Sequence, residues 1–231
     1  NKNLLTNNIS INSNNIRKND IFFAIKGPNK DGNNYSDDAI KKKAAFCVVS
    51  KINRKNNKKI KVKNTLKVLT KSAEDVRKVS KAKFISITGS SGKTSLKELL
   101  AYSLNKLSPT SFSKYSFNNK YGVPLSLINI KKNHDFGVFE VGMDKAGEID
   151  SLTKIIKPDL GVITNISYAH IKNFKNLSKI ASAKAEIMNN IVPGGTIVLN
   201  KDDSYFRFLE NIALKKKLKV ISFSKNKSSS N

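Results

Sequence analysis

One stretch in the middle of the chain constrains the fold most: an apolar run, a glycine turn and an amphipathic segment over residues 84–100. It reads Phe-Ile-Ser-Ile-Thr-Gly-Ser-Ser-Gly-Lys-Thr-Ser-Leu-Lys-Glu-Leu-Leu. The aromatic and β-branched residues at its start favour a strand. The leucines that follow share one face of a helix; they are Leu96, Leu99, Leu100, Leu104 and Leu107. We therefore predict a buried strand, a turn and a helix that begins at Lys93.

The turn has the composition of a phosphate-binding loop. Gly89 and Gly92 let the backbone curl so that successive N–H groups face one anion, and the helix adds the positive end of its dipole. Lys93 would reach the β- and γ-phosphates of a nucleotide, and the Thr94 hydroxyl would bind Mg²⁺. Ile87 stands where the common pattern has its first glycine, so this is the shorter T-G-x-x-G-K-T form. The predicted nucleotide-binding residues are Thr88, Gly89, Ser90, Ser91, Gly92, Lys93, Thr94 and Ser95.

The alternation of elements after residue 84 predicts an α/β fold with a mostly parallel sheet. Apolar runs indicate further strands at 136–141, 159–164, 196–199 and 218–223, and periodic segments indicate helices at 148–156, 177–190 and 205–214. Residues 1–81 form a smaller α/β domain in this interpretation, and residues 82–231 form the P-loop domain. In the smaller domain we expect a solvated loop at 51–63, a weak strand at 66–69 and a helix at 72–81.

The net charge of +26 raises the question of nucleic acid. The arginines are Arg17, Arg54, Arg77 and Arg207, so nearly all of the 43 basic residues are lysines. Codons rich in A and T produce abundant lysine, asparagine and isoleucine throughout a chain. A protein that recognises nucleic-acid bases uses arginine more often. We expect no specific nucleic-acid partner. An alternative function from a different class stays open, namely a nucleotide-dependent binding module that acts on nucleic acid.

The cysteine content and the apolar runs bear on the compartment. Cys47 is the single cysteine and lies in the apolar run 44–49, so we expect a core thiol in a cytoplasmic protein. The apolar runs fall far short of the ~20 residues that span a bilayer, so we expect no membrane insertion. The chain begins without methionine and ends in a polar tail, 225–231, which indicates a fragment of a longer protein.

Three polar residues lie at or just beyond the ends of predicted strands, at the edge where ligands bind in open α/β sheets. They are Glu140, Asn165 and His170. A carboxylate and an imidazole near a triphosphate suit Mg²⁺. The alternatives are a surface role for Glu140 and a hydrogen-bonded loop role for His170. From the residues alone, Lys184 is a solvated residue of a helix.

Taken together, the motifs resemble consecutive blocks of the Mur ligases. The blocks are Thr88–Ser95, Asn118–Pro124, Glu140–Met143 with Gly147–Ile149, Thr164–Ile166 with Ala169–His170, and Ala183–Ile187. The resemblance is specific over the central part of the chain and looser before it. It implies an N-terminal domain that binds a UDP-sugar and a central ATPase domain. The family also has a third, C-terminal domain, and here the sequence departs from the family, because we expect the residues after Phe223 to be too few to form it.

The resemblance also implies roles for single residues. Lys93 and the backbone of residues 89–94 would hold ATP, and Thr94 with Glu140 would hold its Mg²⁺. His170 would serve a second Mg²⁺ together with Lys184, which is typically carbamylated in this family. A carbamate oxygen can bind a metal that an ammonium would repel.

Other matched positions have less specific roles. Asn118 and Asn165 would line the nucleotide and metal site, and the role of Asn200, Asp202 and Asp203 stays open. Only Ser13 carries over to the UDP-sugar site, because Asn14 stands where the family usually has arginine. By resemblance, the catalytic residues are Lys93, His170 and Lys184.

The implied activity is that of an ATP-dependent amide ligase of peptidoglycan precursor synthesis. It would join D-Ala-D-Ala to UDP-MurNAc-tripeptide through an acyl phosphate, with ATP and Mg²⁺ as cofactors, as a monomer. The alternatives are another ligase of the superfamily, such as one adding glutamate to folate, and a form that binds ligands without catalysis. Without a third domain, we expect this chain to bind its ligands but hardly to turn over.

Overall fold

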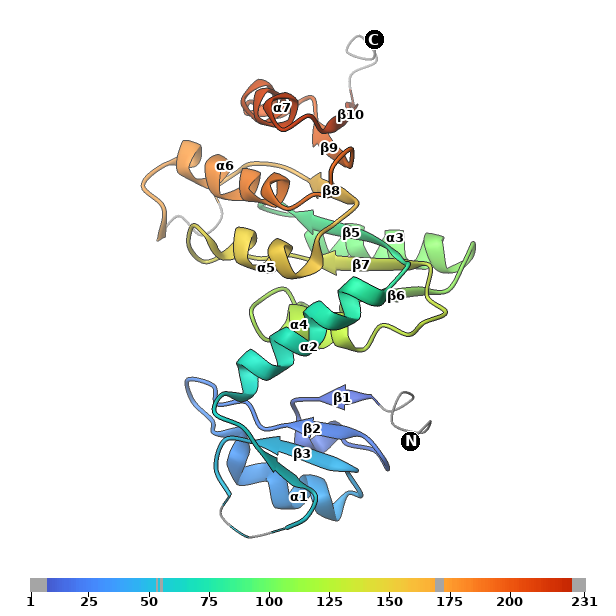
Figure 1. The fold of residues 1–231 in the computed structure, drawn as a ribbon. Helices are drawn as coiled ribbons and strands as arrows, with labels where there is room; N and C mark the ends of the chain where they lie inside the picture. Colours follow the sequence, from blue (N-terminus) through green and yellow to red (C-terminus); the bar gives the residue numbers. More distant parts are fainter. Residues whose placement is uncertain (1–7, 53, 55, 169–172, 226–231) are drawn as a thin grey trace. The chain divides into compact units, whose positions relative to one another are not determined.

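The chain divides into two compact units, Asn1–Lys78 and Val79–Asn231, each with its own parallel β-sheet (Figure 1). The computed structural model describes residues 8–52, 54, 56–168 and 173–225. The predicted α/β class with parallel sheets is confirmed.

The first unit, within the described ranges, has a four-stranded parallel sheet in the order β1-β2-β3-β4. Its strands are β1 (Ile9–Ser10), β2 (Ile21–Phe23), β3 (Phe46–Val49) and β4 (Lys59–Lys61). Its helices are η2 (Ser13–Asn15), η3 (Gly32–Tyr35), α1 (Ser36–Lys41) and α2 (Thr65–Val79). The core gathers Phe22, Cys47 and Val49 with small residues of α1 and its flanks. Cys47 is fully buried, as predicted for a core thiol.

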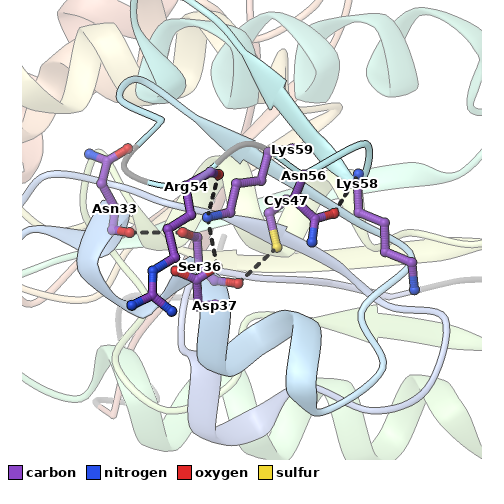
Figure 2. A network of polar contacts seen from close by, with 8 residues as sticks. All are labelled: Asn33, Ser36, Asp37, Cys47, Arg54, Asn56, Lys58 and Lys59. Carbon is purple, nitrogen blue, oxygen red and sulfur yellow. Dashed lines mark hydrogen bonds and ion pairs between the residues drawn. The ribbon is translucent and has the colours of Figure 1, made fainter.

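A polar network links β3 and β4 to the start of α1 (Figure 2). The buried Lys59 side chain pairs with the Asp37 carboxylate at 2.7 Å and donates to the Arg54 carbonyl at 3.4 Å. The Cys47 thiol donates to the Ser36 carbonyl at 3.5 Å, and burial raises the pKa of this thiol to about 11. The network therefore satisfies a buried ammonium, and burial keeps Cys47 in its unreactive thiol form.

The second unit, as far as it is described, has a six-stranded parallel sheet in the order β10-β9-β8-β5-β7-β6. Its strands are β5 (Lys83–Thr88), β6 (Thr110–Phe112), β7 (Phe136–Glu140), β8 (Leu160–Ile163), β9 (Thr196–Asn200) and β10 (Lys219–Phe223). Its helices are α3 (Lys93–Asn105), α4 (Gly122–Ile128), α5 (Glu148–Ile156), α6 (Leu177–Ala185), η5 (Glu186–Asn189) and α7 (Phe206–Lys215). Ile85 and Ile87 of the central strand pack with Val138, Val162 and α3 in one core cluster.

Two expectations for the first unit are wrong. Residues 65–79 form the single helix α2 rather than a strand and a second helix. Leu69 and Ala73, one turn apart, are both buried, and the Thr65 hydroxyl donates to the Ala24 carbonyl at 3.0 Å. The expected loop at 51–63 contains β4, because Lys59 pairs with Cys47 in parallel register.

Two details of the second unit also differ from expectation. Leu99 and Leu107 are exposed, so the apolar face of α3 is narrower than predicted and consists of Leu96, Leu100 and Leu104. The expected loop at 115–124 contains the start of α4 at Gly122. Over the described part of the chain, every helix is too short or too polar to cross a bilayer.

Candidate nucleotide and metal site

The predicted site residues of the second unit converge where three neighbouring strands end. β5 lies between β7 and β8, and the register pairs Ile87 with Glu140 and Thr88 with Ile163. The phosphate-loop sequence leaves β5 at this edge, next to Glu140 and Thr164. Parallel strands therefore bring together residues that are far apart in the sequence.

A cavity of about 780 Å³ opens at this edge. Its walls are the first turn of α3 (Gly92–Ser95), the segment Asn118–Tyr121, the end of β7 at Glu140, and the start of α5 with the residues before it. The first N–H groups of a helix have no acceptor within the helix. The amides at the start of α3 therefore form an anion-binding end that faces this cavity.

The loop between β5 and α3 requires its two glycines. Gly89 has φ +149°, and a Cβ there would lie 1.8 Å from the Thr164 hydroxyl oxygen. Gly92 has φ +77° and caps α3, but a Cβ there would meet open space. Gly89 is thus required by close approach and Gly92 by backbone conformation.

The loop after β8 fixes the other side of the turn. Asn165 accepts from the Ser90 N–H through its carbonyl and from the Ser91 N–H through its side chain, each at 3.0 Å. The Thr164 hydroxyl donates to the Ser91 carbonyl at 2.6 Å. The Ser90 and Ser91 amides therefore donate to the protein rather than facing an anion as we expected. The amides that face the cavity belong to the first turn of α3.

Three side chains meet at the predicted site of the nucleotide's Mg²⁺. The Thr94 hydroxyl donates to one carboxylate oxygen of Glu140 at 2.7 Å, and the Asn118 amide donates to the other at 2.8 Å. Glu140 is 2% exposed, which excludes the surface role considered above. A hydroxyl and a carboxylate at the mouth of a phosphate-binding turn fit Mg²⁺, which takes few protein oxygens and shares phosphate oxygens.

Lys93 lies half-buried across the turn. Its ammonium donates to the carbonyls of Gly89, at 2.8 Å, and Ser90, at 3.4 Å. Burial lowers the pKa of Lys93, and the negative charge of Glu140 opposes that change. The side chain is thus held at the end of the cavity that the first turn of α3 forms.

Lys184 is buried, 2% exposed, so the interpretation of a solvated helix residue is wrong. Burial, with a further effect of the positive charge of Lys93, lowers the pKa of Lys184 to about 7. A large share of its amine is therefore neutral near pH 7, and the neutral amine is the form that can add CO₂. His170, its predicted partner at a second metal, lies outside the described residues. Among the described residues, no three His, Cys, Asp or Glu side chains gather as a metal cluster.

Ser13 lies in the first unit, just beyond the end of β1. It is 7% exposed and begins the short helix η2, which the Asn12 side chain caps. Lys42 donates to the Ser13 carbonyl at 3.1 Å and to the Asn14 side chain at 3.2 Å. Asn14, the position at which the family usually has arginine, therefore bonds to a lysine of the helix α1 C-cap.

The sequence reasoning missed residues that hold the site together. Thr164 fills the space above Gly89, and Ser167 exchanges hydrogen bonds with the Ser90 hydroxyl at 2.8 and 2.9 Å. The Asp203 carboxylate accepts from the N–H groups of Ile166, at 2.7 Å, and Tyr205, at 2.9 Å. In the sequence, Asp203 matched a pattern of the family to which we assigned no role. In the structure, its hydrogen bond to Ile166 helps to order the loop that follows β8.

Comparisons with known proteins agree on one family. The Mur ligase middle domain matches residues 87–231, and the Mur ligase family catalytic domain matches residues 6–101. The UDP-N-acetylmuramoyl-tripeptide--D-alanyl-D-alanine ligase of Rickettsia prowazekii is 40% identical over 209 residues, which cover 89% of this chain and 46% of that protein.

Solved structures give the same result. MurF from Acinetobacter baumannii is similar with a TM-score of 0.84 at 31% identity, over 94% of this chain and 48% of that chain. MurF from Thermotoga maritima, in complex with ADP, gives 0.82 at 28% identity, over 97% and 52%. The chain spans about half the length of the relatives it matches.

Proposed function

The chain belongs to the Mur ligase family, and on that basis we propose that it provides the UDP-sugar-binding and ATP-binding parts of a ligase that joins D-Ala-D-Ala to UDP-MurNAc-tripeptide. It is homologous to MurF over about half of that protein's length. The proposed enzyme forms an amide bond at the expense of ATP in the synthesis of peptidoglycan precursors, in the cytoplasm.

One observation carries the proposal: the Thr94–Glu140–Asn118 cluster at the mouth of a glycine turn that also holds Lys93. The residues present fit ATP and Mg²⁺. The amides of the first turn of α3 and the ammonium of Lys93 suit phosphate oxygens. ADP bound to MurF from Thermotoga maritima is consistent with this choice of nucleotide.

Each residue has a definite task in this proposal. ATP, when bound, would transfer its γ-phosphoryl group to the tripeptide's terminal carboxylate, which gives ADP and an acyl phosphate. The amine of D-Ala-D-Ala would then displace inorganic phosphate and lose a proton to form the amide. Lys93 would neutralise negative charge on the phosphates. Thr94 and Glu140 would provide oxygen ligands for the Mg²⁺ ion. Asn118 fixes the orientation of the Glu140 carboxylate. Catalysis by these groups is positioning and charge stabilisation.

Lys184 has a second task in the proposal. Its carbamate would present anionic oxygens to a second Mg²⁺ together with His170. Burial among apolar residues of α6 favours the neutral amine from which a carbamate forms, and so supports this assignment. The carbamate also replaces a positive charge near Lys93 with a negative one.

Stabilisation by sugar nucleotides tests the substrate. The thermal midpoint of the chain is measured with UDP-MurNAc that carries no peptide, a dipeptide or a tripeptide. A ligand at about 100 times its Kd stabilises the native state by about 2.7 kcal/mol. We expect the largest shift with the tripeptide form, and a smaller shift in a Ser13→Ala variant. A largest shift with the dipeptide form would instead indicate a ligase that adds the third residue, and no shift with any of them would contradict the UDP-sugar site.

A further inference from the structure

A buried lysine outside the proposed machinery lies one turn along α3 from Lys93. Lys97 is 0% exposed, and lysine is almost never fully buried unless its ammonium is paired. Its ammonium donates to the Tyr115 carbonyl at 2.6 Å and lies 2.9 Å from a carboxylate oxygen of Glu98. Glu98 is half exposed, so the contact that accounts for the inward direction of Lys97 is the one with Tyr115.

Tyr115 has an unfavourable backbone conformation, and its side chain is largely exposed. Its φ is +51°, in the left-handed region that residues other than glycine seldom adopt. Its side chain is 77% exposed and contacts the Phe117 ring edge-on. The Lys97 ammonium therefore bonds to a residue whose backbone is in an unfavourable conformation.

The segment 114–121, here called the asparagine loop, carries Asn118. Before it, the Ser113 N–H donates to the Val138 carbonyl at 3.0 Å. Further along, Asn118 donates to Glu140 at 2.8 Å, and its carbonyl accepts from the Gly142 N–H at 2.8 Å. Lys97 binds the loop between these two attachments, so it controls the path by which the chain reaches Asn118.

We propose that Lys97 is a positioning residue that holds the asparagine loop so that Asn118 keeps its bond to Glu140. Helix α3 then carries both the phosphate-binding Lys93 and the anchor of the loop that orients the Mg²⁺-binding carboxylate. The two walls of the cavity are tied to one rigid element. The link to nucleotide binding rests on the function proposed above, whereas the anchoring of the loop does not.

Hydrogen exchange of the free protein tests the anchoring directly. In Lys97→Met, which keeps an unbranched apolar stem, amides of residues 114–121 should exchange about tenfold faster or more, while β5 and β7 keep their protection. Lys106→Met removes the same charge from the exposed C-cap of α3 and should leave the loop unchanged. Unchanged loop exchange in Lys97→Met, or equally faster exchange throughout the unit, overturns the proposal. If Lys97→Met fails to fold, the polar variant Lys97→Gln is measured with the same criteria.

Nucleotide affinity tests the consequence. Without the anchor, the Kd of a non-hydrolysable ATP analogue with Mg²⁺ should rise about tenfold, the effect of one lost charge-assisted hydrogen bond. Because Lys97 acts through Asn118, the double variant Lys97→Met/Asn118→Ala should bind about as weakly as the weaker single variant. If the double variant lost affinity by the product of the two single-variant factors, the proposal that Lys97 acts through Asn118 would be refuted. If the wild type binds no nucleotide while the exchange result holds, the proposed function fails and the anchor stands.

Discussion

Three lysines of the second unit are withdrawn from water to different degrees, and the contacts of each differ. Lys93 bonds to carbonyls of the turn it follows, Lys97 bonds to Tyr115, and Lys184 lies buried on α6. Burial of an ammonium is unfavourable unless its charge is compensated or removed. Burial lowers the pKa of Lys184 to about 7, so its charge is removed near neutral pH rather than compensated.

The stability of the chain should report the titration of Lys184. An unfolded lysine titrates near pH 10.4, about three units above the folded value, so between these values the unfolded state binds more protons. The unfolding free energy of the wild type should then rise with pH by up to about 1.4 kcal/mol per pH unit from this group. Lys184→Met lacks the group. The unfolding free energy of this variant should exceed that of the wild type by the largest amount below about pH 7, and the difference should shrink as the pH rises above about 7.

Urea unfolding of both proteins between pH 6 and about 9, in metal-free and CO₂-free buffer, measures this difference. Lys179→Met, an exposed position of the same helix, is the matched control and should show no such trend. A difference between wild type and Lys184→Met that does not vary with pH would contradict the buried, weakly basic amine.

The burial of Lys184 could not be predicted from its neighbours alone. Ile180, Ala181, Ala183 and Ala185 are buried together with Lys184, so α6 is enclosed around most of its circumference. A lysine in an alanine-rich helix is usually solvated, and only the family resemblance singled it out. The positions of Thr94 and Glu140 were easier to predict, because Thr94 belongs to a turn motif and Glu140 lies at the end of a strand.

The candidate site is built around the strand–turn–helix unit of β5 and α3. Its turn has room for no side chain at position 89, where Thr164 of the neighbouring loop occupies the space. This close approach positions the loop after β8, and with it Asn165, against the turn. The geometry of the turn therefore depends on contacts from two strands.

Alanine at the two glycines should separate close approach from backbone strain. Gly89→Ala combines a clash with an unfavourable φ and should lower the unfolding free energy by about 2 kcal/mol or more. Gly92→Ala meets only the unfavourable φ, and about 1 kcal/mol is expected. Thr164→Ala in the Gly89→Ala background removes the clashing hydroxyl and should restore part of the loss. Urea denaturation measures all four proteins. Equal losses at the two glycines would be inconsistent with this structure.

Long apolar strands and strongly periodic helices of the second unit were predictable, because burial selects one residue pattern along the whole element. Short elements were not. The run Leu66–Leu69 suits a strand or one turn of a helix, and packing of Leu69 and Ala73 decides for the helix. β4 and β6 have three residues each, too few for a pattern, and are defined by pairing with neighbouring strands.

At the scale of the whole molecule, the candidate site residues are divided between two sheets. The described residues of the candidate nucleotide and metal site belong to the second unit, whereas Ser13 belongs to the first. The large positive charge adds weak, salt-sensitive attraction to any polyanion, and the nucleotide binding that we propose does not depend on it.

The central claim is that the turn between β5 and α3 binds the phosphates of Mg²⁺-ATP. Calorimetric titration with a non-hydrolysable ATP analogue, with and without Mg²⁺, tests it most directly. We predict a single site in the wild type, Mg²⁺-dependent affinity that Glu140→Gln weakens, and affinity at least about tenfold lower in Lys93→Ala than in the exposed control Lys106→Ala. An affinity in Lys93→Ala equal to that of the wild type, or no binding by the wild type at all, would contradict the account.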